Sequence, residues 1–307
     1  MAGLAKQAYG AFDELKRAGI HFEEHRRGML VLCSTQSGLA EARRSLTLVG
    51  SAVETLAWQP LTTDEIRAFE PTVSSNVLGG FFVPTDRHVE PRSLSSGLRA
   101  WLRESDVEVS VAERVVGFRH SHGAVTEVVT NRRGIRPKTV LLCTGSWTGD
   151  LVRLLGASVP IVGGRGYVLD YRMPSVEVQR PLYLYEAKIA VSPFDDRTRL
   201  TGAMELGAQK LGASHRRVAG IARQLGDYIL GWPPSLEGVE VESGLRPMTP
   251  DGLPVIGAVP GFRNAYIASG HAMLGVTLGP ATGAAVGLMI ANDRAPESLQ
   301  QLAPDRF

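Results

Sequence analysis

A run of twenty residues without a single charge, from Ala272 to Ala291, constrains the fold of this chain more than any other feature. Its length matches that of a membrane-spanning helix, and glycines recur in it at every fourth position, as in membrane dimer faces. Glycine and proline make up five of the twenty residues, so the mean hydropathy is low. Pro280 is expected to split the run and leave a short helix after it. The sequence therefore predicts a buried helix packed closely on a sheet, and no transmembrane span.

Helical and strand patterns alternate along the rest of the chain. Apolar residues at helical spacing predict helices over 1–18, 37–51, 62–70, 91–105, 147–156 and 214–230. Strand patterns cover 20–34 as two strands around a turn, 77–83, a β-meander from 107 that feeds a buried strand at 139–143, and most of 159–203. Because parallel-type and antiparallel-type strands interleave with helices, we expect an α/β layer plus an α+β layer, with the chain crossing between them more than once.

Charge and cysteine content exclude some classes of protein. The 33 basic and 31 acidic residues give a formal net charge of +2, so no overall field attracts nucleic acid. Cys33 and Cys143 lie in apolar, strand-like runs, which suits reduced thiols in the core of a cytoplasmic protein. The first residues carry charges early and lack the apolar core of a signal peptide.

Two strand-to-helix turns suit the binding of an electron-rich group. In "TVLLCTGSWTGDLVRLLG" an apolar strand leads through Thr144 and Gly145 into a helix, and "SGHAMLGVTLGPATG" carries glycines that allow a close backbone approach. The N–H groups and the dipole at a helix start favour negative charge. A simple turn also explains the first stretch, and tight helix–sheet packing explains the second, so both alternatives stay open.

Arg246 lies in "GLRPMTPDGLPVIG", between a glycine and a proline. A guanidinium binds a carboxylate through two parallel hydrogen bonds, which orients an acidic ligand as well as attracting it. The alternative is an ion pair with Glu240 or Glu242 on the same predicted strand. No metal site is predicted, because His21 and His25 lie in a strand-like pattern without cysteines at zinc spacing.

Four stretches together resemble the FAD-dependent D-amino acid oxidase superfamily, in particular its bacterial D-amino acid dehydrogenases and its glycine and sarcosine oxidases. They are "GGFFVPTDRHVEPRSL", "VLLCTGSWTGDLVRLLG", "SGLRPMTPDGLPVIG" and "AYIASGHAMLGVTLGPATG", and they occur in the family's order over nearly the whole chain. The resemblance implies substrate-domain segments at 1–90 and 159–240 and FAD-binding segments at 91–158 and 241–307.

The resemblance also implies which residues form the site. FAD contacts are expected from Val115 at the adenine, from Thr144, Gly145 and Trp147 near the ribityl chain and flavin, and from Gly270, Met273, Leu274, Gly275, Val276 and Thr277 around the flavin ring. Arg246 matches the arginine that binds the substrate carboxylate. Tyr167 and Tyr185 are expected to form walls of the substrate pocket, and His271 lies in the flavin loop.

The implied reaction passes a hydride from the Cα of a D-amino acid or related amine to FAD. The family begins with a βαβ unit that carries G-x-G-x-x-G and an acidic residue about 20 positions later, and this chain has neither. Gly164 and Gly166 are its one glycine pair separated by a single residue, and Leu169 takes the third position. Three alternatives therefore stay open: a shortened product of a complete flavoenzyme, a subunit that needs a partner chain to supply this unit, or a remnant that binds no flavin.

Overall fold

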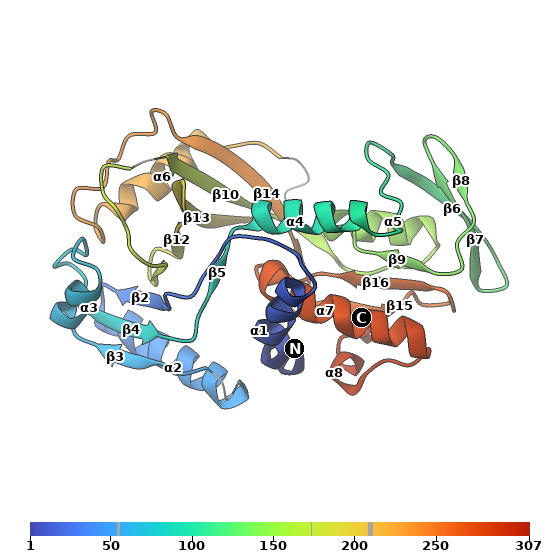
Figure 1. The fold of residues 1–307 in the computed structure, drawn as a ribbon, viewed down its shortest axis with the longest axis horizontal. Helices are drawn as coiled ribbons and strands as arrows, with labels where there is room; N and C mark the ends of the chain where they lie inside the picture. The colour runs from blue at the N-terminus through green and yellow to red at the C-terminus, as the bar shows by residue number, and fades with distance from the viewer. Residues whose placement is uncertain (54–55, 173, 208–210) are drawn as a thin grey trace.

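The computed structural model describes residues 1–53, 56–172, 174–207 and 211–307. Its strands form one eight-stranded sheet, two three-stranded sheets and a two-stranded ladder, with helices between and around them (Figure 1). The eight-stranded sheet occupies the left half of the view, and the two three-stranded sheets lie on the right. This agrees with the expected combination of α/β and α+β layers.

The eight-stranded sheet is mostly antiparallel and has the order β14-β10-β13-β12-β11-β2-β4-β3. Its strands come from two regions that are far apart in the sequence. The first region gives β2 (Met29–Cys33), β3 (Gln59–Leu61) and β4 (Gly79–Val83); the second gives β10 (Val162–Arg172), β11 (Leu182–Leu184), β12 (Ile189–Pro193), β13 (Arg197–Leu206) and β14 (Glu240–Met248). The parallel pairing of β11 with β2 joins the two regions.

The two faces of this sheet are covered differently. Helices α3 (Thr63–Phe69) and α6 (His215–Leu225) pack on one face, over a core that includes Leu30, Leu184 and Leu200. Helix α2 (Gln36–Ala52) packs on the other face, against Val31 and Phe81. The second face is called the α2 face below.

The smaller sheets hold the strands that precede the two glycine-containing turns. β9 (Val140–Leu142) pairs in parallel with β16 (Ala265–Ser269), which pairs with β15 (Val255–Ala258). β9 is thus an edge strand of this sheet as far as the structure describes it. β6 (Val115–Ser121), β7 (Ala124–Thr130) and β8 (Gly134–Ile135) form the other sheet, while β1 (Glu24–His25) pairs with β5 (His88–Val89).

The predicted helices are present with ends shifted by at most two residues, except that α6 ends at Leu225 instead of at residue 230. α1 (Ala2–Arg17) packs along α7 (Gly275–Asn292), and α4 (Pro91–Glu104) crosses the middle of the molecule in Figure 1. Thr62 and Glu65 form the capping box that begins α3. The short elements are η1 (Gly145–Trp147), α5 (Thr148–Leu154), α8 (Glu297–Gln300) and η2 (Pro304–Arg306).

Two predictions about local structure were wrong. α7 begins at Gly275 and continues through Pro280, so the proline does not split it. A proline this close to the helix start removes one hydrogen bond, and burial of Leu278 and Ala281 against α1 offsets that loss. The alternating stretch from Val107 to Val111 forms no strand, and its three valines are exposed because no described strand lies beside it.

None of the helices in the described ranges has both the length and the apolar character needed to cross a membrane. The two cysteines are free, as expected, but only Cys33 is buried. Cys143 follows the last residue of β9 and is exposed, so the expectation that both lie in the core was wrong for this thiol.

Candidate functional site

Arg246 lies on β14 opposite Gly164 of β10, and its guanidinium extends over Gly166. A Cβ atom on Gly166 would lie 1.8 Å from Arg246 Nη1, so this space exists only because residue 166 has no side chain. The guanidinium donates a hydrogen bond to the carbonyl oxygen of Ala203 at 3.1 Å. Of the two glycines that failed to match a nucleotide-binding motif, Gly166 therefore makes room for this arginine, while a Cβ atom on Gly164 would meet Met248 and Met204.

The charge of Arg246 has no carboxylate partner among the described residues. Glu242 pairs with Arg92 at 2.6 Å, and Glu240 lies 3.5 Å from Arg172, so the alternative ion pairs on β14 do not form. Burial lowers the pKa of the Arg246 guanidinium, but an arginine stays protonated in proteins. A partly buried and uncompensated cation of this kind favours an anionic ligand.

Arg246 is on the α2 face of the large sheet. Residues directly opposite each other on neighbouring strands share a face, and the face alternates along each strand. Gly166 therefore lies on the same side as Val168 of β10. A row of opposed residues runs from there across the sheet to the part that α2 covers: Val168, Thr201, Ala190, Tyr183, Val31 and Phe81.

The two strand-to-helix turns lie next to this arginine. The backbone N–H of Ala272, in the loop before α7, donates to the carbonyl oxygen of Pro247 at 3.0 Å, one residue from Arg246. A Cβ atom on Gly270 would lie 2.9 Å from Thr249, and Gly270 has a φ of 79°, so a glycine is required for this close approach. The three segments predicted separately from the sequence thus come together.

A hydroxyl network joins the turn after β9 to the end of β16. The buried Thr148 Oγ1 lies 2.8 Å from the carbonyl oxygen of Gly145 and 3.0 Å from Ser269 Oγ, and its single proton can be donated to either; Ser269 Oγ lies 3.0 Å from the same carbonyl oxygen, to which it can donate. Thr144 Oγ1 lies 3.1 Å from Thr148 Oγ1. Sequence reasoning missed Thr148 and Ser269. Thr148 directly follows the turn after one apolar strand, and Ser269 ends another apolar strand, and these positions were the available signal.

The start of α7 is suited to a flat, electron-rich ligand. No side chain caps this helix end, and its first turn has no acidic residue, so backbone N–H groups remain available. Residues 273–277 are exposed, among them Met273 at 70% and Val276 at 43%. Apolar side chains around free N–H groups fit the isoalloxazine end of FAD. For the pyrophosphate and ribose, this chain offers no G-x-G-x-x-G motif.

Tyr167 and Tyr185 lie away from Arg246. Tyr167 is fully buried on the α6 face of β10, where its hydroxyl donates to Glu205 Oε1 at 2.8 Å. Tyr185 packs under α2, with Lys188 Nζ 3.8 Å from the centre of its ring. The structure does not bring either ring to the guanidinium.

The remaining predicted residues lie around the two turns. His271 Nε2 is 3.1 Å from Thr282 Oγ1 of α7, and burial lowers the pKa of this histidine, which favours the neutral ring. Trp147 is 53% exposed at the end of η1. Val115 begins β6 and lies opposite Thr130 of β7.

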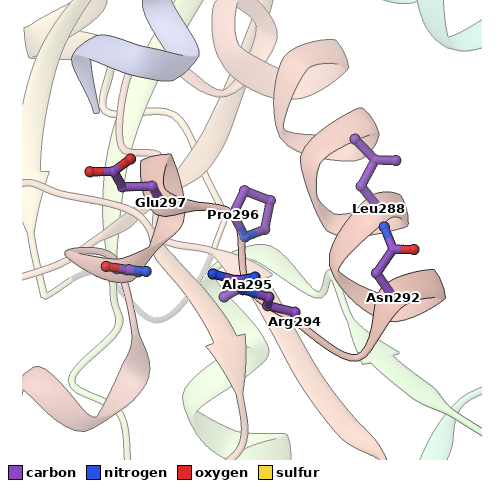
Figure 2. A pocket seen from close by; sticks show the side chains of 7 residues that line it. Leu288, Asn292, Arg294, Ala295, Pro296 and Glu297 are labelled. Atoms are coloured by element: carbon purple, nitrogen blue, oxygen red, sulfur yellow. The ribbon is translucent and has the colours of Figure 1, made fainter.

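Two cavities differ in their relation to these residues. One of about 510 Å³ borders the start of α7, with Met273 of the preceding loop and Val276 and Thr277 of the helix in its wall. Figure 2 shows the other, at the far end of α7, where Leu288 and Asn292 face the segment around Pro296. An 18-residue helix is roughly 27 Å long, so the second pocket lies away from Arg246.

One cluster has the composition of a metal site. Ligand atoms of Glu23, His25 and Asp195 lie within 4.8 Å of one another. His25 Nε2 is 2.7 Å from Glu23 Oε1, and the same oxygen accepts from the backbone N–H of Asp195 at 2.9 Å. Hydrogen bonds among its own members thus account for the positions of these groups.

Comparison with known proteins identifies a family and a fold. The family model described as FAD dependent oxidoreductase matches residues 1–288. A D-amino acid dehydrogenase of Helicobacter pylori is 23% identical over 282 residues, which is 92% of this chain and 66% of that protein, just under two thirds of its length.

Solved structures show the same fold at low sequence identity. Glycine oxidase from Bacillus cereus superposes with a TM-score of 0.85 at 18% identity, over 97% of this chain and 82% of that one. L-proline dehydrogenase from P. horikoshii gives a TM-score of 0.86 at 18% identity, over 99% and 82%.

Proposed function

The chain belongs to the family of FAD-dependent oxidoreductases, and on this premise we propose that it carries the substrate-binding part of an enzyme that oxidises the CH–NH2 or CH–NH group of a D-amino acid or related amine. The observation that carries the proposal is the guanidinium of Arg246, which is partly buried and has no carboxylate partner among the described residues. FAD, when bound, supplies the acceptor for the hydride.

Each part of the site has a role in this proposal. Arg246 binds the substrate carboxylate through two hydrogen bonds and so fixes the direction of the Cα–H bond. The exposed backbone and apolar side chains of 273–277 hold the flavin ring, and the N-terminus of α7 stabilises negative charge at its edge. Gly270 lets this loop lie against Thr249, close to the arginine.

The proposed reaction needs position more than a strong base. A substrate bound as the neutral amine can lose a hydride from Cα, which FAD would accept, and the iminium ion that results hydrolyses in water to a keto acid and an amine or ammonium ion. His271 is held by Thr282 and has a lowered pKa, so it fits a neutral wall of the site rather than a charged one. Exclusion of water and alignment by Arg246 are what the chain contributes.

The absorption spectrum of the purified chain, with and without added FAD, tests the proposal. We expect a bound flavin band that bleaches without oxygen when a D-amino acid is added. Arg246→Ala should keep the flavin band, but the band should bleach at least tenfold more slowly than in the wild type. Arg216→Ala changes an exposed face of a helix and should behave as wild type. Bleaching that survives in Arg246→Ala would show that the carboxylate site lies elsewhere.

A second candidate is that a βαβ unit from outside these 307 residues completes the nucleotide site, from a partner chain or a longer product. Two observations favour it. β9 has an open side: Val140 donates to Asn264 of the neighbouring connection, so the N–H of the next residue, Leu141, points away from β16. The exposed valines of 107–111 form a second strand-like segment, with which no strand of the described residues pairs.

Fusion of a βαβ unit carrying G-x-G-x-x-G before residue 1 separates the two candidates. If the second is right, the fused protein takes up FAD and the 307-residue chain does not. Leu141→Pro, which removes the N–H on the open side of β9, should abolish uptake by the fusion, and Leu141→Ala should preserve it. Uptake that is unaffected by Leu141→Pro would contradict pairing at this edge.

A further inference from the structure

The cavity of about 510 Å³ beside the loop before α7 has a mixed wall. α1 contributes Tyr9 and Phe12, and the connection between β4 and β5 contributes Asp86. Ala190 and Thr201 line it from the large sheet, on the same face as Arg246. It therefore opens between the substrate-side sheet and the segment that the proposed function assigns to the flavin.

Asp86 is a carboxyl group without a cationic partner among the described residues. Its Oδ1 accepts hydrogen bonds from the Tyr9 hydroxyl at 3.3 Å and from the backbone N–H of Arg87 at 3.0 Å. Its Oδ2 has no hydrogen-bond partner among the described residues, and no ion pair to this carboxylate occurs there. Burial raises the pKa of Asp86, as expected for a carboxylate whose charge is not compensated.

Tyr9 reinforces this arrangement. Burial, and then the charge of Asp86, raise the pKa of Tyr9 to about 12, so its hydroxyl remains a donor to the carboxylate. The donated proton keeps Oδ1 occupied and leaves Oδ2 for another group.

The other charged groups in the described wall are paired with each other. Arg87 binds Asp13 at 2.8 Å and Glu24 at 3.5 Å, and its guanidinium lies 4.8 Å from the centre of the Tyr9 ring. Glu24 also binds Lys16 at 2.7 Å and Arg26 at 3.1 Å. Arg87 is thus turned toward two carboxylates other than its neighbour, and the uncompensated charge in this wall is that of Asp86.

Asp86 lines this cavity, and Arg246 is connected to it through β13. Ala203, whose carbonyl oxygen accepts from Arg246, is two residues from Thr201 in the cavity wall, or about 7 Å along β13. Asp86 comes from a different wall. Because Asp86 and Arg246 come from different elements, we expect them to bind different parts of one substrate, the carboxylate at Arg246 and a nitrogen further along the side chain at Asp86.

We propose that Asp86 binds a second, distal cationic nitrogen, so that the site takes amino acids whose side chains end in an ammonium group. This rests on the proposed function, in which Arg246 holds the carboxylate. Asp86 supplies a desolvated acceptor at the far end of the substrate, and a neutral side chain of the same length leaves that acceptor unpaired.

Isothermal titration calorimetry of the 307-residue chain with D-lysine and D-norleucine tests this, since the two ligands differ only in the terminal ammonium group. The wild type should bind D-lysine at least tenfold more tightly. Asp86→Asn should remove this preference, and Glu14→Gln, an exposed carboxylate on α1, should keep it. Unchanged melting temperatures will show that the variants are folded, and the wild-type comparison of the two ligands needs no variant.

Titration with 1,5-diaminopentane, which has no carboxylate, separates this proposal from the proposed function. Arg246→Ala should weaken the binding of both amino acids and leave the affinity for the diamine unchanged. Asp86→Asn should weaken the binding of the diamine. If Arg246→Ala leaves the affinities for both amino acids unchanged, the proposed function fails, while a weaker binding of the diamine to Asp86→Asn would still support the role of Asp86. No preference for D-lysine in the wild type, no binding of D-lysine, or a preference that persists in Asp86→Asn overturns the role of Asp86.

Discussion

At the scale of single residues, Arg246 and Gly166 depend on each other. A methyl group at residue 166 would occupy the position of the Arg246 guanidinium, because its carbon would lie 1.8 Å from Nη1 and 2.2 Å from the guanidinium carbon. We expect Gly166→Ala to displace the guanidinium and to weaken binding of a D-amino acid carboxylate at least tenfold. Calorimetric titration of the variant with D-norleucine measures the effect.

Gly244 is the matched control for this prediction. It lies directly opposite Gly166 on β14, and a Cβ atom there would meet nothing within 4 Å. Gly244→Ala should therefore leave the affinity within about twofold of wild type. Equal losses in the two variants would mean that a general distortion of the β10–β14 pair, and not the position of Arg246, determines binding.

The sequence allows the place of some single residues to be predicted better than that of others, and the difference has a physical reason. The place of Arg246 between Gly244 and Pro247 could be read from the sequence, and its carboxylate-binding role, which the resemblance implies, stays a prediction. The pocket-wall role of Tyr167 stays a prediction. The face on which its side chain lies depends on strand register, which pairs β10 with β13 and β14 and cannot be read from β10 alone.

At the scale of elements, η2 is held to the β14–β15 connection by one ion pair. Arg306 Nε donates to Asp251 Oδ2 at 2.8 Å, and this interaction lowers the pKa of Asp251 to about 2. The same arginine donates to the carbonyl oxygen of Leu253 at 2.9 Å. Asp251 thus fixes the C-terminal residues beside the segment that contacts Gly270.

We expect Asp251→Asn to lower the melting temperature at pH 7 by a few degrees. The pKa of this carboxyl is lower in the folded chain than in the unfolded chain, where it is about 4. The pair therefore stabilises the fold above that pH, and the contribution is lost as the pH falls toward 2. The difference in melting temperature between variant and wild type should shrink correspondingly in scans at decreasing pH.

Asp305→Asn serves as the comparison, because Asp305 is an exposed carboxylate in η2 next to Arg306 and has no ion pair among the described residues. Its melting temperature should follow that of wild type at every pH. A pH-independent loss in Asp251→Asn would assign the effect to the hydrogen bonds of the turn instead of the charge.

Elements with local signals were predicted well, and those that depend on distant partners were not. The capping box of Thr62 and Glu65 defines the start of α3 from four consecutive residues. The start of α7 depends on packing against α1, nearly the whole chain away, which outweighs the local signal of Pro280. The alternation of 107–111 is a real strand pattern, but a strand also needs a neighbour.

At the scale of the whole molecule, the fold class could be predicted from the alternating helix and strand patterns. The candidate site is formed by contacts between segments that are distant in the sequence. Arg246, the loop before α7 and the turn after β9 meet through the Ala272–Pro247 and Ser269–Gly145 hydrogen bonds. A site of this kind requires the two sheet systems to keep a fixed relation. α4, which crosses between them, is attached to the large sheet by ion pairs at two points of different burial, the buried carboxylate of Glu90 and the exposed guanidinium of Arg92.

The buried contact should dominate this attachment. Glu90, the N-cap of α4, accepts from the backbone N–H of Ser93 and from Arg197, and it lies 3.4 Å from Arg199, which also binds Asp170 at 2.7 Å. All four charged side chains are at most 9% exposed. Removing one partner of a buried network leaves an uncompensated charge, so Glu90→Gln should lower the free energy of unfolding by about 3 kcal/mol.

Glu242→Gln removes the second contact, the exposed pair with Arg92 on α4, and should cost less than about 1 kcal/mol. Urea denaturation of both variants gives the two free energies from midpoint and slope. If α4 links the sheets through Glu90, its variant should also weaken D-norleucine binding, because the loop before α7 and Arg246 would no longer be held in register. Equal small losses of stability in the two variants would mean that Glu90 is not the main link between α4 and the sheet. A loss of stability in Glu90→Gln without a loss of binding would mean that the attachment of α4 does not determine the geometry of the site.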